Sequence, residues 1–284
     1  EETVKSFTRE TLSSWYRDYV HRGRLVVSTV GDFSHEEWVD ELREMCKHLP
    51  ESGKRSKSVI PVERPKQIQV VTAEKQPLFQ SHVLIGFLGA RFNDEERFAL
   101  RVLSSCLAGQ GGRLFLELRD KLSLAYTVAP MNSESIESGA FAFYIGCSPE
   151  KLERAITGIR NEIDKILSKP LGAKELERAK QYLVGRFELD MQRNSAQAML
   201  FGLDEIYGIG YDHALQYPGK IRAVTAKAVQ AAAQKFLTPD SAVLSVVHPT
   251  PVDEAFVRRA WDKSGTGSNR SANRPRKGVA ELTA

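Results

Sequence analysis

Residues 111–128 read GGRLFLELRDKLSLAYTV, and this stretch decides the fold of the chain. Two glycines open it. A helix is predicted next, because Leu114, Phe115 and Leu118 fall on one side at helical spacing. The chain then becomes rich in apolar and β-branched residues, which predicts a strand. The stretch therefore contains a helix-to-strand corner.

Arg119 falls at the end of the predicted helix, and Tyr126 falls at the start of the predicted strand. A corner of this kind can bring a guanidinium and a phenol together. The two groups could then clamp a carbonyl oxygen or a developing oxyanion. Most arginines and tyrosines in such places are surface or packing residues instead. The chemistry of these two residues alone leaves both interpretations open.

Strands and helices follow one another in segregated runs around this corner. That order predicts an α+β fold with a largely antiparallel sheet covered by helices. The expected strands are residues 68–71, 82–88, 124–132, 139–147 and 242–247. The expected helices begin at Asn93, at Ser148-Pro149 and at Ala173, and the last of these is expected to end near Glu205. After a turn at 207–211, one helix is expected to end near Arg222 and a second to run from a cap at Thr225 to Phe236, and residues 253–263 are a candidate for one more.

The first fifty residues predict a helix, a strand and a helix. The first helix is predicted within 8–20, where an apolar stripe at helical spacing comprises Leu12, Trp15, Tyr16 and Tyr19. The strand is predicted over the β-branched residues 24–30. The second helix follows an N-cap at Ser34, with Glu37 three residues on, and its inward side is predicted to carry Trp38, Leu42 and Met45. One strand without a partner is not stable. These residues therefore either add to the following domain or end a preceding one.

The run Gly109-Gln110-Gly111-Gly112 precedes a predicted helix, so phosphate binding has to be considered. The run lacks the Lys-Ser/Thr ending of a P-loop and does not match the dinucleotide fingerprint. A tight turn and a close backbone approach are the favoured roles of these glycines.

Composition excludes several functional classes. The net charge is +4 with acidic and basic residues interspersed, which indicates no nucleic-acid surface. No apolar run is long enough for a membrane span. Cys46, Cys106 and Cys147 have no metal-like spacing, so all three are expected to be reduced thiols. The basic run 270–277 lies in a tail whose composition is typical of disorder, and we expect it to be solvated. Contact of this run with an anionic partner, as in a nucleic-acid or membrane accessory, is the less favoured alternative.

The pattern GGRLF-x-x-LR-x-x-x-x-LAY resembles the signature of the pitrilysin/insulinase family of zinc metallopeptidases. The resemblance implies the second domain of a family half-unit. It also implies that Arg119 binds a substrate carbonyl and that Tyr126 stabilises the tetrahedral intermediate. The order helix, strand, Gly-Asp-Phe, helix and proline-rich linker is similar to the end of the family's first domain. The family's usual proline and asparagine before that strand are absent here, where residues 20–24 read VHRGR.

A catalytic half of that family carries H-x-x-E-H, which places two imidazoles on one helix face to hold zinc. No such motif occurs here, and no two histidines are four residues apart among His21, His35, His48, His82, His213 and His248. His35-Glu36-Glu37 comes nearest but lacks the second histidine. We therefore expect no cofactor in this chain, and zinc on a missing or partner half.

These observations predict a portion of a zinc-dependent peptidase that supplies substrate-binding and oxyanion-stabilising residues to a zinc-bearing half. The alternative is a catalytically silent structural or assembly subunit of the same family. The expected partners are a peptide or unfolded polypeptide and a zinc-bearing half, in the same full-length chain or a separate subunit, with a homodimer as one form. The compartment stays unknown, with the bacterial cytoplasm or periplasm favoured.

The expected organisation has four parts. Residues 1–50 are the end of a preceding domain, residues 51–66 a linker, residues 67–250 a complete second domain, and residues 251–284 a mostly disordered tail.

Overall fold

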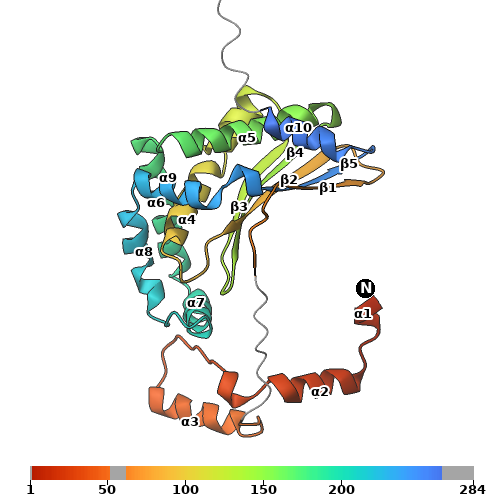
Figure 1. Cartoon of the computed structure of the whole chain (residues 1–284). Helices are drawn as coiled ribbons and strands as arrows, with labels where there is room; N and C mark the ends of the chain where they lie inside the picture. Colours follow the sequence, from red (N-terminus) through yellow and green to blue (C-terminus); the bar gives the residue numbers. More distant parts are fainter. Residues whose placement is uncertain (1, 52–61, 264–284) are drawn as a thin grey trace, which may run out of the picture. The chain divides into compact units, whose positions relative to one another are not determined.

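The computed structural model describes residues 2–51 and 62–263. The chain divides into two compact units, and each is described here by itself. One comprises residues 1–62 and 184–222, and the other comprises residues 63–183 and 223–284. The second of these contains the sheet, labelled β1–β5 in Figure 1, and the helix-to-strand corner. We call it the sheet unit.

The sheet unit is built on a five-stranded sheet in the order β1-β5-β2-β4-β3. Its strands are β1 (Gln69–Glu74), β2 (Ser81–Gly89), β3 (Thr127–Ser133), β4 (Gly139–Cys147) and β5 (Val243–His248). Strands β1 and β5 pair in parallel, and every other neighbouring pair is antiparallel. The prediction of an α+β fold with a largely antiparallel sheet is therefore confirmed.

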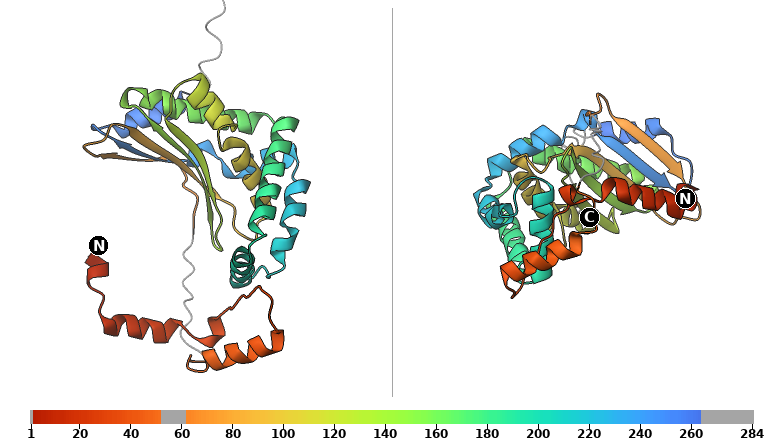
Figure 2. Two further views of the ribbon diagram at one scale, coloured as in Figure 1. Left: turned by 180° about the vertical axis from the view of Figure 1, so that it is seen from behind. Right: turned by 90° about the horizontal axis from the view of Figure 1, so that it is seen from below.

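Helices cover one face of this sheet, as Figures 1 and 2 show. They include α4 (Glu96–Leu107), α5 (Leu152–Ser168), α9 (Ala226–Phe236) and α10 (Glu254–Asp262). Strand residues alternate between the two faces, so Val83, Ile85 and Phe87 are buried while Leu84 between them is 39% exposed. The core lies between the helices and one side of the strands.

The packing of α10 extends the sheet unit past the expected boundary at residue 250. Trp261 is fully buried, and its indole N–H donates to the carbonyl of Pro239 over 3.3 Å. The Arg160 guanidinium lies 4.9 Å from the Trp261 ring centroid. Burial of a large side chain of this kind stabilises a fold by about 2–3 kcal/mol. The remainder of the expected tail, 264–284, lies outside the described residues.

Two predicted helix boundaries were wrong. Helix α4 begins at Glu96 and not at Asn93, because the Asp94 carboxylate accepts a hydrogen bond from the Arg91 backbone N–H over 2.8 Å and holds a turn there. The helix predicted over 173–205 is two helices, α6 (Ala173–Asp190) and α7 (Asn194–Ile206), separated by a turn. A further helix, α8 (His213–Ala223), follows.

The N-terminal residues form the helices α1 (Glu2–Lys5), α2 (Arg9–Tyr19) and α3 (His35–Cys46) and the 3₁₀ turn η1 (Arg22–Arg24). Thr8 caps α2, and the Ser34 hydroxyl accepts from the Glu37 backbone N–H over 3.5 Å at the start of α3. The predicted strand over 24–30 was wrong: residues 25–30 form no strand, since no described strand of this unit is available to pair with them.

The predicted apolar stripe of α2 is present but is not buried. Leu12, Trp15 and Tyr16 are 55%, 59% and 47% exposed. No residue of α1, α2 or α3 is buried, so the predicted inward position of Met45, which is 57% exposed, was also wrong. The expected linker falls largely on residues 52–61, which lie outside the described residues.

Among the described helices, none has the length and apolar character that crossing a membrane requires.

Candidate functional site

The structure brings Arg119 and Tyr126 together at the predicted corner. Arg119 lies in the π-helical segment η2 (Phe115–Lys121), and Tyr126 directly precedes β3. The Arg119 Cζ atom is 4.8 Å from the Phe115 ring centroid and 5.7 Å from the Tyr126 ring centroid. Both distances are within the range of a cation–π contact. Arg119 is exposed, and Tyr126 is 70% exposed, so the pair is open to a ligand.

Two buried leucines fix the corner from below. Leu118 and Leu124 are 1% and 3% exposed, and the Leu124 N–H donates to the Leu118 carbonyl over 2.8 Å. Between them Ser123 takes the left-handed backbone conformation, with a φ of 49°, and its N–H donates to the Arg119 carbonyl over 3.1 Å. The chain therefore reverses within a few residues. This tight turn is why two side chains seven positions apart meet.

Helix α5 supports the same corner. A Cβ atom on Gly158 would lie 2.9 Å from Leu118 Cδ2 and 3.2 Å from Leu124 Cδ1, so α5 approaches these leucines as closely as a glycine allows. The Lys151 Nζ donates to the Ser123 carbonyl over 2.9 Å. The corner thus rests on the core helix and is not a free loop.

The glycines ahead of η2 have the roles predicted for them. Gly109 has a φ of 75°, which favours glycine at this turn. A Cβ atom on Gly112 would lie 2.1 Å from the Ala108 carbonyl oxygen, a distance that no side chain could occupy. A tight turn and a close backbone approach are both confirmed.

A histidine–tyrosine pair that the sequence analysis missed lies near the corner. The Tyr126 N–H donates to the Gly146 carbonyl over 3.0 Å, and Gly146 is paired with His82 in the sheet. The His82 Nδ1 and the Tyr144 hydroxyl are 2.7 Å apart on the sheet face that the helices leave uncovered. The sequence did contain a signal for this pair. Side chains alternate between the two faces of a strand, so His82 and Tyr144 could have been placed on the face opposite to the buried apolar residues.

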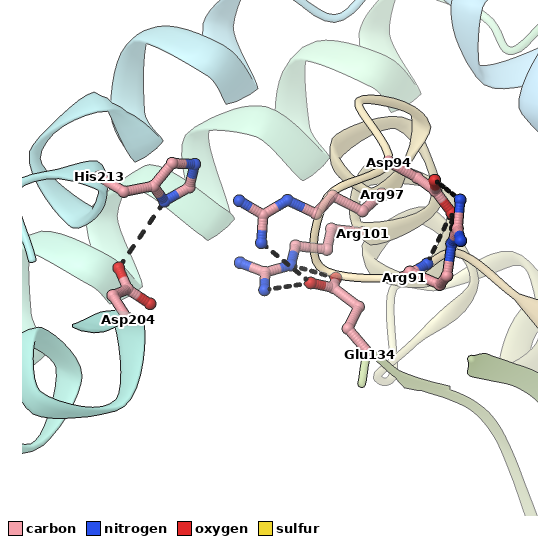
Figure 3. A network of polar contacts seen from close by, with 7 residues as sticks. All are labelled: Arg91, Asp94, Arg97, Arg101, Glu134, Asp204 and His213. Carbon is pink, nitrogen blue, oxygen red and sulfur yellow. Dashed lines mark hydrogen bonds and ion pairs between the residues drawn. The ribbon is translucent and has the colours of Figure 1, made fainter. Parts of the chain in front are cut away.

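An ion-pair cluster holds the β3–β4 turn on α4 (Figure 3). The Arg101 guanidinium binds both Glu134 carboxylate oxygens, at 2.5 Å from Nε and 2.7 Å from Nη2. Arg97 Nη1 lies 3.4 Å from the same carboxylate, and the Arg97 and Glu134 side chains are 4% and 5% exposed. The burial of this ion-pair cluster and the bidentate geometry of its Arg101–Glu134 pair indicate a structural role.

Figure 3 also draws a pair from the other unit. His213 Nδ1, at the start of α8, lies 3.7 Å from the Asp204 carboxylate of α7. Asp204 is 7% exposed. The sequence analysis did not single out either residue, because nine positions and a turn separate them.

The thiols of the sheet unit do not act as nucleophiles. Burial raises the pKa of the Cys106 thiol to about 12 and the pKa of the Cys147 thiol to about 11. Neutral pH therefore leaves both protonated, and the thiolate is the reactive form. In the described part of the chain, no three histidine, cysteine, aspartate or glutamate residues are grouped so as to hold a metal ion. These residues do not fit a zinc site.

Comparison with known proteins connects this geometry to a family. The family profile described as "Peptidase M16 inactive domain" matches residues 6–183. An uncharacterized zinc protease of Streptomyces coelicolor is 28% identical over 218 residues, which are 72% of this chain and 46% of that protein. The uncharacterized zinc protease YmxG of Bacillus subtilis is 25% identical over 252 residues, or 88% of this chain and 60% of that protein. The chain spans about half the length of these curated relatives.

Solved structures share the fold. The crystal structure of a peptidase M16 inactive domain from Pseudomonas fluorescens superposes with a TM-score of 0.78 at 22% identity, over 88% of this chain and 60% of that one. A chain of complex III2 from Candida albicans, with Inz-5 bound, gives a TM-score of 0.66 at 11% identity, over 81% and 57%.

Proposed function

Because the chain belongs to the family of the peptidase M16 inactive domain, we propose that it supplies substrate-binding and oxyanion-stabilising groups to a zinc-bearing half. The resemblance to pitrilysin-like metallopeptidases is confirmed by the family match. In this proposal zinc is held by the other half, and what supports it is the description of the matching family model as an inactive domain together with the zinc-protease names of the curated relatives.

The corner formed by Arg119 and Tyr126 carries this proposal. The two side chains are exposed, lie side by side, and are held by buried leucines, so a substrate would meet them without rearrangement of the fold. In the proposed roles, Arg119 donates guanidinium N–H groups to a substrate carbonyl. Tyr126 donates its hydroxyl proton in a hydrogen bond to the oxyanion of the tetrahedral intermediate. Groups fixed in advance in this way stabilise the transition state more than the ground state.

The proposed substrate is a peptide or an unfolded polypeptide. The zinc-bearing half would be another part of the same full-length chain or a separate subunit. A homodimer is one form that the assembly would take. We propose further that residues 1–50 end a preceding domain of the same kind. The unburied stripe of α2 supports this idea, because an apolar helix face of that size normally packs against a neighbouring element.

The alternative is a structural or assembly subunit without a part in catalysis. The structural likeness to a chain of complex III2 from Candida albicans favours considering it, since the same fold occurs there in a large assembly. The two proposals differ in what they require of Arg119 and Tyr126, because an assembly role needs neither group at the exposed corner.

Peptide hydrolysis with zinc present separates the two proposals. The chain alone would be compared with the chain mixed with an H-x-x-E-H half from the same genome. We expect activity only in the mixture, and loss of that activity in Arg119→Ala and Tyr126→Phe. Activity of the chain alone would overturn the assignment of zinc to another half. Stable binding between the two proteins without hydrolysis would support the structural alternative.

A further inference from the structure

The loop 109–111 and helix α6 line a cavity of about 280 Å³ in the sheet unit, and it is open to solvent beside the exposed Arg178 and Tyr182. Besides the loop, Ser105, Arg178, Ala179 and Tyr182 line it. Its available hydrogen-bond donors are three loop amides, the Arg178 guanidinium and the Tyr182 hydroxyl, whereas the Ser105 hydroxyl already donates to the Ala179 carbonyl over 3.4 Å. A cavity of this composition favours a ligand that accepts hydrogen bonds.

Arg178 brings a positive charge that its neighbours leave uncompensated. The nearby Glu175 carboxylate is bound by Arg113 through both oxygens, at 3.2 Å from Nε and 2.7 Å from Nη2. That pair is neutral as a whole. Within residues 62–263, Arg178 makes no ion pair. One net positive charge therefore remains beside the loop.

The loop amides are available as well. In the described parts of the chain, no group accepts a hydrogen bond from the backbone N–H of Gly109, Gln110 or Gly111. Gly109 has a φ of 75°, and a left-handed residue in such a loop lets successive N–H groups converge on one anion. The guanidinium lies close to these amides, since a Cβ atom on Gly111 would be 3.1 Å from Arg178 Nη1.

A second cavity of about 580 Å³ adjoins the first, because Ser105, Ala108 and Tyr182 line both. Phe92 and Leu183 line it together with polar residues, and its two charged residues, Arg101 and Glu134, form an ion pair that is neutral as a whole. A molecule with an anionic group in the first cavity can therefore extend an uncharged chain into the second. A single uncompensated cation matches a monoanion such as a carboxylate better than a phosphate dianion, and a guanidinium binds a carboxylate through two parallel hydrogen bonds.

We propose that the loop 109–111 and Arg178 bind the C-terminal carboxylate of a peptide, whose preceding residues lie along Tyr182 in the adjoining cavity. The choice of a peptide rests on the proposed function. The site itself rests on the cavity, the uncompensated guanidinium and the available amides. It would anchor one end of a substrate apart from the corner at Arg119 and Tyr126.

Binding of a fluorescein-labelled hexapeptide that ends in leucine tests the proposal without requiring hydrolysis. The whole chain of 284 residues would be titrated with the free acid and with the C-terminal amide of the same peptide. We expect the amide to bind about tenfold more weakly or worse, as the loss of a charge-assisted hydrogen bond predicts. Equal affinities for the two peptides would overturn the proposal, and so would no binding of either at millimolar protein.

Two variants and a matched control locate the site. Arg178→Gln removes the charge, and Gly111→Ala displaces the guanidinium, so each is expected to abolish the preference for the free acid. Lys174→Gln removes one charge from an exposed position on α6 outside the cavity, and it should keep the preference. Near-ultraviolet circular dichroism checks folding. A preference that survives in both site variants, or that Lys174→Gln also abolishes, would contradict the assignment.

An internal carboxylate provides a further comparison. An amidated hexapeptide with glutamate at its third position should bind as weakly as the plain amide, because the proposed site receives the anion at the end of the chain. Binding as tight as that of the free acid would contradict recognition of the C-terminus. In the assembled enzyme, Arg178→Gln should raise KM and leave kcat unchanged, whereas failure of the proposed function would appear as absent hydrolysis despite this binding.

Discussion

The sheet unit and the N-terminal residues 2–51 contain helices of similar sequence character and differ in what those helices bury. Helix α4 has eight buried residues in twelve, including Leu100, Val102 and Leu103. Helices α2 and α3 have none, although both are amphipathic and begin with a side-chain cap. Apolar spacing and caps specify that a helix forms. Whether its apolar face becomes core depends on a partner surface elsewhere in the chain or in another molecule.

Truncation in the core of the sheet unit is expected to have the largest effect. Phe143 on β4 is fully buried against Phe141, with ring centroids 5.5 Å apart. Phe143→Ala should lower the free energy of unfolding by about 3–5 kcal/mol, because it removes a large apolar side chain and leaves a cavity. Urea unfolding followed by circular dichroism measures this. A change below 1 kcal/mol would mean that the sheet unit is not the stable part of the chain.

The next largest difference between the two regions is expected from two ion pairs, one buried and one exposed. Glu134→Ala removes a buried carboxylate that both Arg97 and Arg101 contact and should destabilise by about 3 kcal/mol. Asp40→Ala removes the partner of Arg43 on α3, where both side chains are more than 70% exposed, and should change stability by less than about 0.5 kcal/mol. The same urea titration applies to both. Similar effects of the two substitutions would contradict the assigned difference in burial.

The cysteines test burial through pH. The folded sheet unit keeps the Cys106 thiol protonated, with a pKa of about 12, whereas an unfolded thiol titrates near about 8.5. The unfolded state therefore loses this proton first, and stability should fall as the pH rises above about 8.5, by up to about 2 kcal/mol at pH 10. Unfolding of the native chain and of Cys106→Ala at pH 8 and pH 10 measures the difference between them.

Cys46, among the N-terminal residues, provides the control for the prediction about the buried thiols. Cys46 on α3 is only half-buried and should react with a thiol reagent in the folded chain, while Cys106 and Cys147 should react only after unfolding. If the free energy of unfolding depended on pH equally in the native chain and in Cys106→Ala, burial of the Cys106 thiol would not be the cause of the pH dependence.

The smallest effect is expected for Trp15 on α2. Its ring is 59% exposed and contacts Tyr19, with ring centroids 5.2 Å apart. Trp15→Ala should change the stability of this chain by less than about 0.5 kcal/mol, as is usual for an exposed position. The urea midpoint of the sheet unit is the readout. A loss of 2 kcal/mol or more would show that the stripe already packs within the chain.

The same contrast explains what could be predicted from the sequence. The bounds of β4, residues 139–147, were predicted correctly, because alternating apolar residues there lie beside a partner on each edge. The identical logic failed at residues 24–30, where the pattern is β-branched but none of the described residues of that unit forms a strand that could pair with it. Asn93 was misjudged as a cap because Asp94 forms a local turn with Arg91, a competition between side-chain and helical hydrogen bonds that spacing does not reveal.

The functional residues likewise differ in whether the sequence could predict that they lie together. Arg119 and Tyr126 were predicted as a pair because the turn that joins them is local. The cavity at Arg178 was not, since its guanidinium and the loop 109–111 are about seventy residues apart and meet only through the packing of α6. His82 and Tyr144 meet through strand pairing in the same manner. Residues that are distant in the chain carry no sequence spacing from which a contact can be inferred.

The turnover of Tyr126→Phe, measured with the proposed zinc-bearing half present, tests the central claim most directly, because the substitution removes one hydroxyl from the exposed corner and leaves the ring against Arg119. If Tyr126 stabilises the oxyanion, kcat should fall by about 10²–10³ while KM changes little. An unchanged kcat, or a rise in KM alone, would contradict the oxyanion role.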